Sequence, residues 1–148
     1  MAVSIKWYGN ALKNICKGGL NWMASGGSTV KCVLLTSTYT PNQDTHEFYS
    51  HLTNELTTTG GYTAGGLTLT KVDVSYDGAS NETRLDCNDP SWANATFTCR
   101  YAVFYISTGV AGTSALLCYI DFGANQSPSG VTFVIQLAAT GALKLTAA

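Results

Sequence analysis

Runs of residues that are apolar at both odd and even positions predict the strands at the centre of the fold. In the β-rich stretch 96–106, residues 101–106 are apolar at both odd and even positions. Residues 30–35 and 115–122 show the same pattern. Such runs predict strands covered on both faces, with 96–106 as the central one. Arg100, the one charge inside this stretch, is expected either to reach solvent at the strand end or to form an ion pair.

Alternating apolar and polar positions predict the remaining strands. They are expected at residues 67–76, 83–87, 131–137 and 143–145. Within the first of them the apolar positions shift by one residue, which predicts a β-bulge near Thr70 and Lys71. Asp77-Gly78 predicts a hairpin turn before the next strand. The glycine-rich segment 57–66 is expected to be a flexible connector.

Two helices are expected in addition. Residues 5–16 carry apolar residues at helical spacing, and Gly18-Gly19 would end this helix. It either caps one end of a sheet or continues an arm, residues 1–7, that docks on a neighbouring chain. Asp44, followed three residues later by Glu47, resembles a capping box and predicts a short helix through Leu52.

These elements predict one mainly β domain over residues 1–148. An N-terminal arm and helix would occupy about 1–19, and a β body about 28–146. Many strands separated by turns, with at most two short helices, indicate an antiparallel β-sandwich or a partly open barrel.

The composition excludes several kinds of partner. Charged residues make up 11% of the chain, and the net charge is −1, so no basic surface is expected for nucleic acid. We find no secretory signal and no apolar run long enough to cross a membrane. A net charge near zero favours association with other protein copies.

The cysteines predict packing rather than disulfide bonds. They are Cys16, Cys32, Cys87, Cys99 and Cys118. The number is odd, the spacings are wide and no CxxC motif occurs, so we expect reduced and mostly buried thiols. Cys99 and Cys118 fall in strands that could be neighbours, which leaves one disulfide possible but not predicted.

No residue pattern indicates catalysis, a metal or a cofactor. His46 and His51 are five positions apart and do not share a helix face, and no third ligand is evident. Asp86 and Asp89 could suggest acid–base chemistry, but no nucleophile or base accompanies them, which favours turn-capping roles. The chain is therefore expected not to be an enzyme.

Five segments carry a resemblance to a known family. They are KWYGNALKN, VLLTSTYTPNQDTHEFYS, GYTAGGLTL, SWANATFTCRYAV and GVTFVIQLAATGALKLT. Together they run from Lys6 to Thr146, and they resemble small structural proteins of siphophage virions, including cement proteins of cyanophages. The resemblance implies a protein that decorates the outer surface of the capsid and cements adjacent capsomers, stabilising the expanded shell.

The partners implied are the major capsid protein of the same phage and neighbouring copies of the chain as a homo-oligomer. The protein would reside in the virion, on the outer capsid surface, and in the host cytoplasm during assembly. Two alternatives remain: a tail-tube or tail-tip subunit, and a carbohydrate-binding module for host recognition. The carbohydrate-binding module would need exposed aromatic side chains, for which the candidates are Trp7, Tyr39, Tyr62 and Trp92.

Two segments are the expected contacts with partners. The terminal segment 1–8 ends in two aromatics, which are favoured anchors in interfaces, and the polar loop 38–47 is long for a passive connection. The candidate interface residues are Ile5, Lys6, Trp7, Tyr8, Tyr39, Pro41, Asn42, Gln43 and Asp44.

Overall fold

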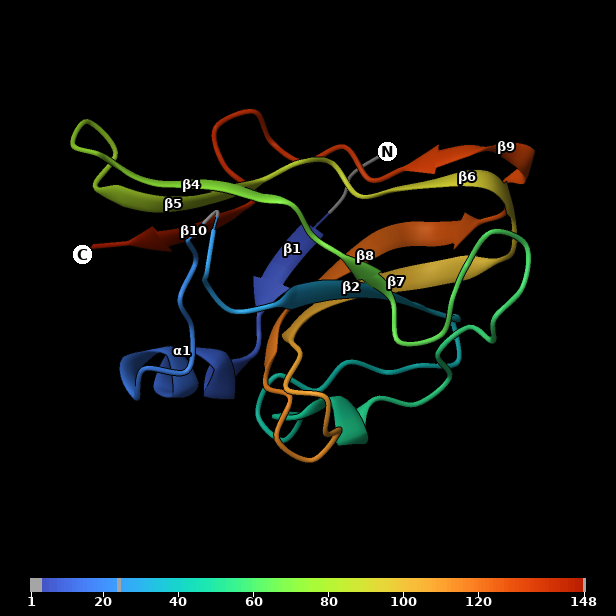
Figure 1. The fold of residues 1–148 in the computed structure, drawn as a ribbon, viewed down its shortest axis with the longest axis horizontal. Helices are drawn as coiled ribbons and strands as arrows, with labels where there is room; N and C mark the ends of the chain where they lie inside the picture. Colours follow the sequence, from blue (N-terminus) through green and yellow to red (C-terminus); the bar gives the residue numbers. More distant parts are fainter. Residues whose placement is uncertain (1–3, 24, 148) are drawn as a thin grey trace.

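The chain folds into two layers of antiparallel strands, which are seen one above the other in Figure 1. The structure, a computed structural model, describes residues 4–23 and 25–147. The strands are β1 (Ser4–Trp7), β2 (Val30–Leu35), β3 (Leu67–Thr68), β4 (Lys71–Asp77), β5 (Glu82–Cys87), β6 (Ser91–Thr96), β7 (Cys99–Ile106), β8 (Leu116–Gln126), β9 (Ser129–Val134) and β10 (Leu143–Thr146). The helices are α1 (Gly9–Cys16) and the 3₁₀ helix η1 (Tyr49–His51).

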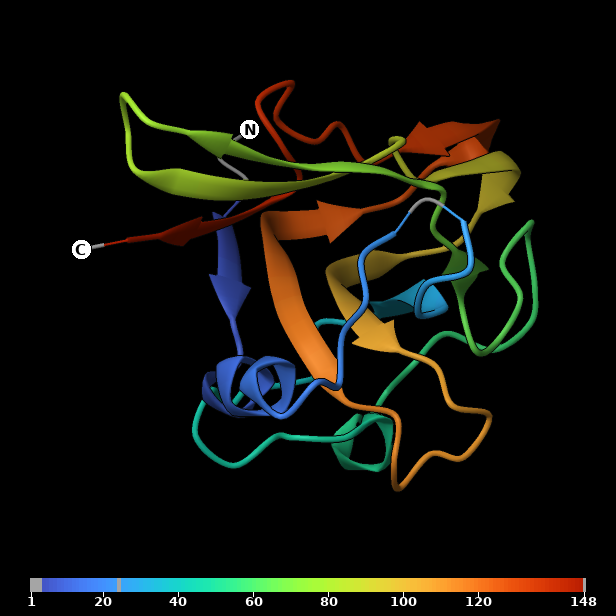
Figure 2. The same cartoon turned by 60° about the vertical axis from the view of Figure 1, so that its left-hand side comes forward.

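The first layer is a five-stranded sheet in the order β1-β8-β7-β2-β3. The second layer consists of the three-stranded sheet β10-β5-β4 followed by the two-stranded sheet β6-β9. Figure 2 shows α1 and η1 below the first layer, on the side away from β4 and β5. The mainly β, sandwich-like fold that we expected is therefore confirmed, and the sheets do not close into a barrel.

The central strand lies where the two-sided pattern predicts it. β7 is third of five, between β8 and β2, and pairs along its length with both. Its even positions, such as Phe104, face the other layer and join the main core. Its odd positions, Val103 and Tyr105, face α1 and the loop 36–66 and join a second core. Two covered faces explain why residues 101–106 of the strand are apolar at both odd and even positions.

Arg100 forms an ion pair across the first layer. Its Nε lies 2.7 Å from Oδ1 of Asp121 on β8, and both side chains are partly exposed. The hydrogen bond from Arg100 lowers the pKa of Asp121 below its usual value. Of the two expectations for Arg100, the structure therefore shows the ion pair.

The N-terminal helix is shorter than expected, and a strand precedes it. Residues 5–16 were assigned to one helix, but residues Ser4–Trp7 form β1 and the helix begins at Gly9. β1 pairs with β8, with Ile5 opposite Ile120. The open edge of β8 supplies hydrogen bonds that the helical spacing of side chains cannot reveal.

The expected helix from Asp44 to Leu52 is wrong except for its last turn. Only η1 is helical there. Asn42 Oδ1 accepts the backbone N–H groups of Asp44 and Thr45, and His51 Nδ1 accepts those at positions 47 and 48. The Asn42 contacts resemble a helix N-cap, but His51 takes the N–H groups of residues 47 and 48, which a continuing helix would bond to its own carbonyls.

The sequence pattern also missed β6 and the full length of β8. No strand was predicted before residue 96, and the stretch 96–106 was predicted as one strand, but β6 ends at Thr96 and the chain changes layers at residues 97–98. Trp92 and Ala95 of β6 are buried between the layers. β8 continues past the apolar run to Gln126, which pairs with Cys99.

Other local expectations are confirmed. The register shifts between Lys71 and Asp73, next to the expected bulge, and β4 and β5 form the expected hairpin. All five cysteines are free thiols; four are buried and Cys16 is exposed. Burial raises the pKa of Cys87 and Cys99 to about 12, so these thiols remain protonated at neutral pH.

Segment 57–66 packs closely against the strands rather than crossing open solvent. Gly60 has a φ of +52°, and a Cβ atom there would lie 1.9 Å from the backbone oxygen of Thr96. Glu55 anchors the segment, because its Oε1 accepts hydrogen bonds from the Tyr62 hydroxyl and the Gly65 N–H, each at 2.6 Å. Glycine is needed at residue 60 for the close approach to β6.

Candidate interaction surface

The two segments expected to contact partners lie side by side. Gln43 Nε2 donates to the Trp7 carbonyl at 2.7 Å, and the Gly9 N–H donates to the Gln43 carbonyl at 2.9 Å. Asn10 Nδ2 also donates to the Asp44 carbonyl at 3.2 Å. These bonds join the end of β1, the start of α1 and the loop 38–47 into one surface. We call it the N-loop surface, defined by Lys6, Trp7, Pro41, Asn42, Gln43 and Asp44.

Two of the nine candidate residues support this surface from below. Tyr8 and Tyr39 are 0% and 1% exposed, so neither side chain can contact a partner of this fold. Their hydroxyl oxygens are 2.7 Å apart, and Tyr39 Oη is 2.8 Å from His46 Nδ1. Burial raises the pKa of Tyr39 to about 12 and raises that of Tyr8 further above its usual value. Both rings therefore position the loop rather than form its contacts.

A third candidate, Ile5, lies elsewhere. Its side chain lines a groove between the layers, together with Phe122 of β8 and Val131 of β9. Successive strand residues point to opposite sides, so Lys6 faces the side of the N-loop surface, whereas the side chains of Ile5 and Trp7 face the second layer. Trp7 contributes its backbone carbonyl to the surface. Pro41 is partly exposed, and residues 42–44 are exposed.

An ion pair ties the N-loop surface to α1. Lys13 Nζ lies 2.9 Å from Oε1 of Glu47, and this contact lowers the pKa of Glu47. Lys13 also donates to Asn10 Oδ1 at 2.7 Å. The surface is thus polar, carries one charge of each sign in Lys6 and Asp44, and is held by hydrogen bonds on several sides.

The two histidines are closer than their spacing suggests. The rings of His46 and His51 are 6.3 Å apart, and burial, together with the nearby His51, lowers the pKa of His46. Nδ1 of each ring already takes part in a hydrogen bond within the chain. Within residues 4–23 and 25–147, no three histidine, cysteine or acidic side chains are grouped to hold a metal ion.

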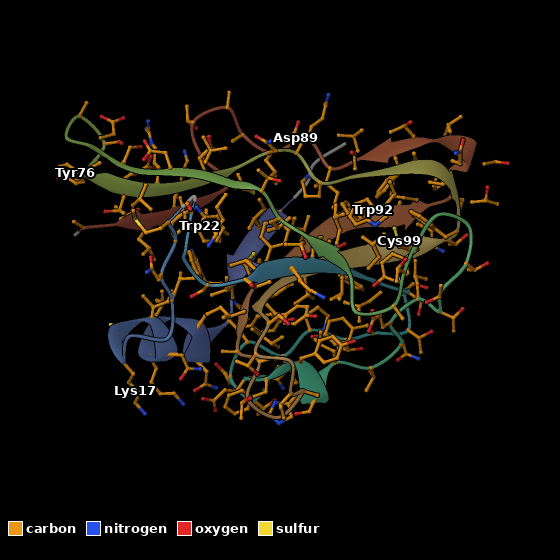
Figure 3. The ribbon with its side chains drawn as sticks, in the orientation of Figure 1. Lys17, Trp22, Tyr76, Asp89, Trp92 and Cys99 are labelled. Carbon is orange, nitrogen blue, oxygen red and sulfur yellow. The ribbon has the colours of Figure 1, made fainter. Side chains whose placement is uncertain are left out.

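The candidate carbohydrate-binding aromatics do not form an exposed platform. Tyr39, Tyr62 and Trp92 are each at most 5% exposed, and Figure 3 shows Trp92 beneath β6, directed between the layers. Trp7 is partly buried, and its Nε1 donates to the Lys144 carbonyl at 2.8 Å. These four side chains mainly pack the fold.

The two aspartates singled out in the sequence act on backbone groups. Asp89 Oδ1 accepts the Leu137 N–H at 3.0 Å, and Asp86 Oδ1 accepts the Cys87 N–H at 3.0 Å. The first bond joins the turn before β6 to the segment after β9. The turn-capping interpretation is not confirmed, because Asp86 lies within β5 and Asp89 binds the N–H of a distant segment rather than a group of its own turn.

Sequence reasoning missed the groove between the layers. It has a volume of about 920 Å³ and lies along β9, between that strand and the end of β8. The available signal was the alternation at Val131, Phe133 and Ile135, which points one side of a strand toward the core. The pattern does not show that the first layer leaves this side partly uncovered.

Comparisons with known proteins add no relative: no protein-family model, curated protein or solved structure matches the chain. Among the described residues, no helix is both long and apolar enough to cross a membrane.

Proposed function

We propose that this chain is a structural virion protein that binds the outer surface of a phage capsid and cements adjacent capsomers, without catalytic activity. The five resembling segments, which run from Lys6 to Thr146, support the family. The observation that carries the proposal is the N-loop surface. Two segments about 35 residues apart, each a candidate contact from sequence alone, form one hydrogen-bonded surface.

A cement protein needs a rigid body that presents polar contacts in fixed positions. Here the N-loop surface rests on the second core, through Tyr8 and Tyr39. Many copies act together on a shell, so modest contacts add through effective concentration. A protein that binds only the expanded shell stabilises that state by mass action.

The proposal is tested by reversing the charges of the N-loop surface. The variant Lys6→Glu/Asp44→Lys exchanges two exposed charges, and neither side chain takes part in the hydrogen bonds that hold the loop. Its matched control is Asp73→Lys, an exposed aspartate on β4 in the other layer. We expect the double variant to be depleted from purified particles by about tenfold or more, since like charges across an interface disfavour binding. The control should be retained; equal occupancy of both variants would contradict the proposal.

A second candidate, a tail-tube subunit, has one observation in its favour. The β4–β5 hairpin extends beyond the first layer, and Tyr76 lies near its tip (Figures 1 and 3). Val72, Val74 and Tyr76 of this hairpin are 44–61% exposed. A hairpin arm with one exposed apolar side could join stacked rings. Deleting residues 75–80 would shorten this hairpin. The deletion would abolish tail assembly if the chain is a tail-tube subunit, and it would leave tails intact if the chain is a capsid cement protein.

A further inference from the structure

β9 is an edge strand whose outer backbone groups face no other described strand. It pairs only with β6 in its sheet. The Ile135 N–H donates to the Pro90 carbonyl at 2.9 Å, so Ile135 directs its backbone groups toward the β6 side. Backbone groups alternate in direction along an antiparallel strand. Val134 and Gln136 therefore direct their N–H and C=O groups toward the open side.

The open side of β9 borders the uncharged groove between the layers. Val131 is 56% exposed although it shares the inward side of β9 with Phe133 and Ile135. Phe133 rests on Trp92, Phe97 and Phe122, with ring centroids 5.6–5.9 Å apart. None of the twelve residues that line the groove is charged.

Three other edge strands, β4, β1 and β10, carry features that block strand pairing. β4 contains Asp73 and Asp77 and has a shifted register, while β1 contains Lys6 and β10 contains Lys144. Charged residues and bulges are common means by which proteins prevent edge-to-edge association. From Val131 to Gln136 the chain has no charge and no proline, so this edge is open to pairing.

We propose that β9 pairs antiparallel with β9 of a second copy, giving a two-fold symmetric dimer whose second layers form one continuous sheet. In the register that places Phe133 on the axis, Thr132 lies opposite Val134 of the second copy, and Val131 lies opposite Ile135. Each pair is uncharged, and the inward side brings apolar side chains of both copies over the grooves. The chain's net charge of −1 adds little repulsion. In this register the strand is complementary to itself, so we expect its partner to be a second copy of the chain.

The dimer forms without a capsid, so it is tested on the purified chain, separately from the proposed function. Sedimentation equilibrium would measure the dimer dissociation constant of the unmodified chain, of Val131→Glu and of the control Val74→Glu. Val74 is also an exposed valine of an edge strand, at 44%. Val131→Glu would bury a charge at the two-fold contact, so we expect dimerisation about tenfold weaker or more. Val74→Glu should leave it unchanged.

A second measurement avoids any dependence on how Val131→Glu folds. Hydrogen exchange on the unmodified chain would follow the amides of Thr132, Val134 and Gln136 as the protein concentration rises. We expect their exchange to slow as the dimer forms. The proposal is overturned if the unmodified chain sediments as a monomer throughout, if both glutamate variants dimerise alike, or if these amides exchange at the same rate at every concentration.

Discussion

At the scale of single residues, the N-loop surface depends on a short chain of buried hydrogen bonds. Tyr8, Tyr39 and His46 are linked end to end at 2.7 and 2.8 Å. The tyrosine hydroxyls are buried, so water cannot replace a lost partner without a rearrangement. Every buried side-chain nitrogen or oxygen of the described chain has a hydrogen-bond partner. Removing one partner leaves the other unpaired in a buried site, which lowers the free energy of unfolding.

Tyr39→Phe is expected to lower the free energy of unfolding by about 1–3 kcal/mol, because the Tyr8 hydroxyl loses its partner in a site of 0% exposure. Urea denaturation would measure the change. In the Tyr39→Phe background, Tyr8→Phe should cost less than it does in the unmodified chain, because the hydroxyl that it removes is already unpaired. Strictly additive losses would contradict a coupled pair.

His46 gives the fold a dependence on acidic pH. Its folded-state pKa is lowered, first by burial and then by His51. A histidine with a lowered pKa binds its proton more weakly in the folded state than in the unfolded state. Its contribution to the free energy of unfolding is therefore fully present above the unfolded pKa of about 6.5, and it is lost as pH falls from there toward the folded pKa. The free energy of unfolding should fall between pH 7 and pH 5. His46→Gln, which keeps an acceptor for Tyr39, should reduce this slope; an unchanged slope would exclude His46 as its source.

At the scale of elements, hydrogen bonds to the backbone determine whether a segment forms a helix or a strand where the apolar periodicity alone cannot. The strands β2, β7 and β8 were predictable, because two covered faces place apolar residues at both odd and even positions. The helix expected from Asp44 was wrong, since His51 binds N–H groups that the helix would need. β1 was hidden within a helical pattern because its stability comes from pairing with β8.

The same reasoning applies to the candidate site. The sequence predicted the two segments of the N-loop surface but not that they lie side by side. Nothing in a single sequence reports the hydrogen bond between Gln43 and Trp7. It also ranked Tyr8 as a contact because aromatic residues are common in interfaces, and Tyr39 because it falls in the polar loop 38–47. Whether a tyrosine anchors a partner or its own core depends on the elements packed over it, here α1 and the loop 36–66.

Glu55 is expected to hold the glycine-rich segment in place. Its carboxylate accepts hydrogen bonds from Tyr49, Tyr62 and the Gly65 N–H, and it contributes to the raised pKa of Tyr62. Glu55→Ala should lower the free energy of unfolding by about 1–3 kcal/mol and speed hydrogen exchange in residues 57–66. Glu55→Gln, which keeps one acceptor oxygen, should lose less. Equal exchange in all three proteins would show that the segment is held by its backbone contacts alone.

At the scale of the whole molecule, the sandwich separates two kinds of surface. The N-loop surface, at the end of β1 and the loop 38–47, lies on the α1 side of the first layer, whereas β9 lies at an edge of the second layer (Figures 1 and 2). The groove runs along β9. The two proposals together place the shell contact on the first surface and the contact with a second copy on β9. Proteins that link neighbouring subunits need such separate, simultaneously accessible contacts.

The most direct test of capsid binding is a cryo-electron-microscopy map of purified virions, with this chain located in the density. We expect it on the outer face of the shell, at boundaries between capsomers, with Lys6 and Asp44 facing the major capsid protein. Density confined to the tail, or no density for the chain anywhere on the particle, would contradict the proposed function.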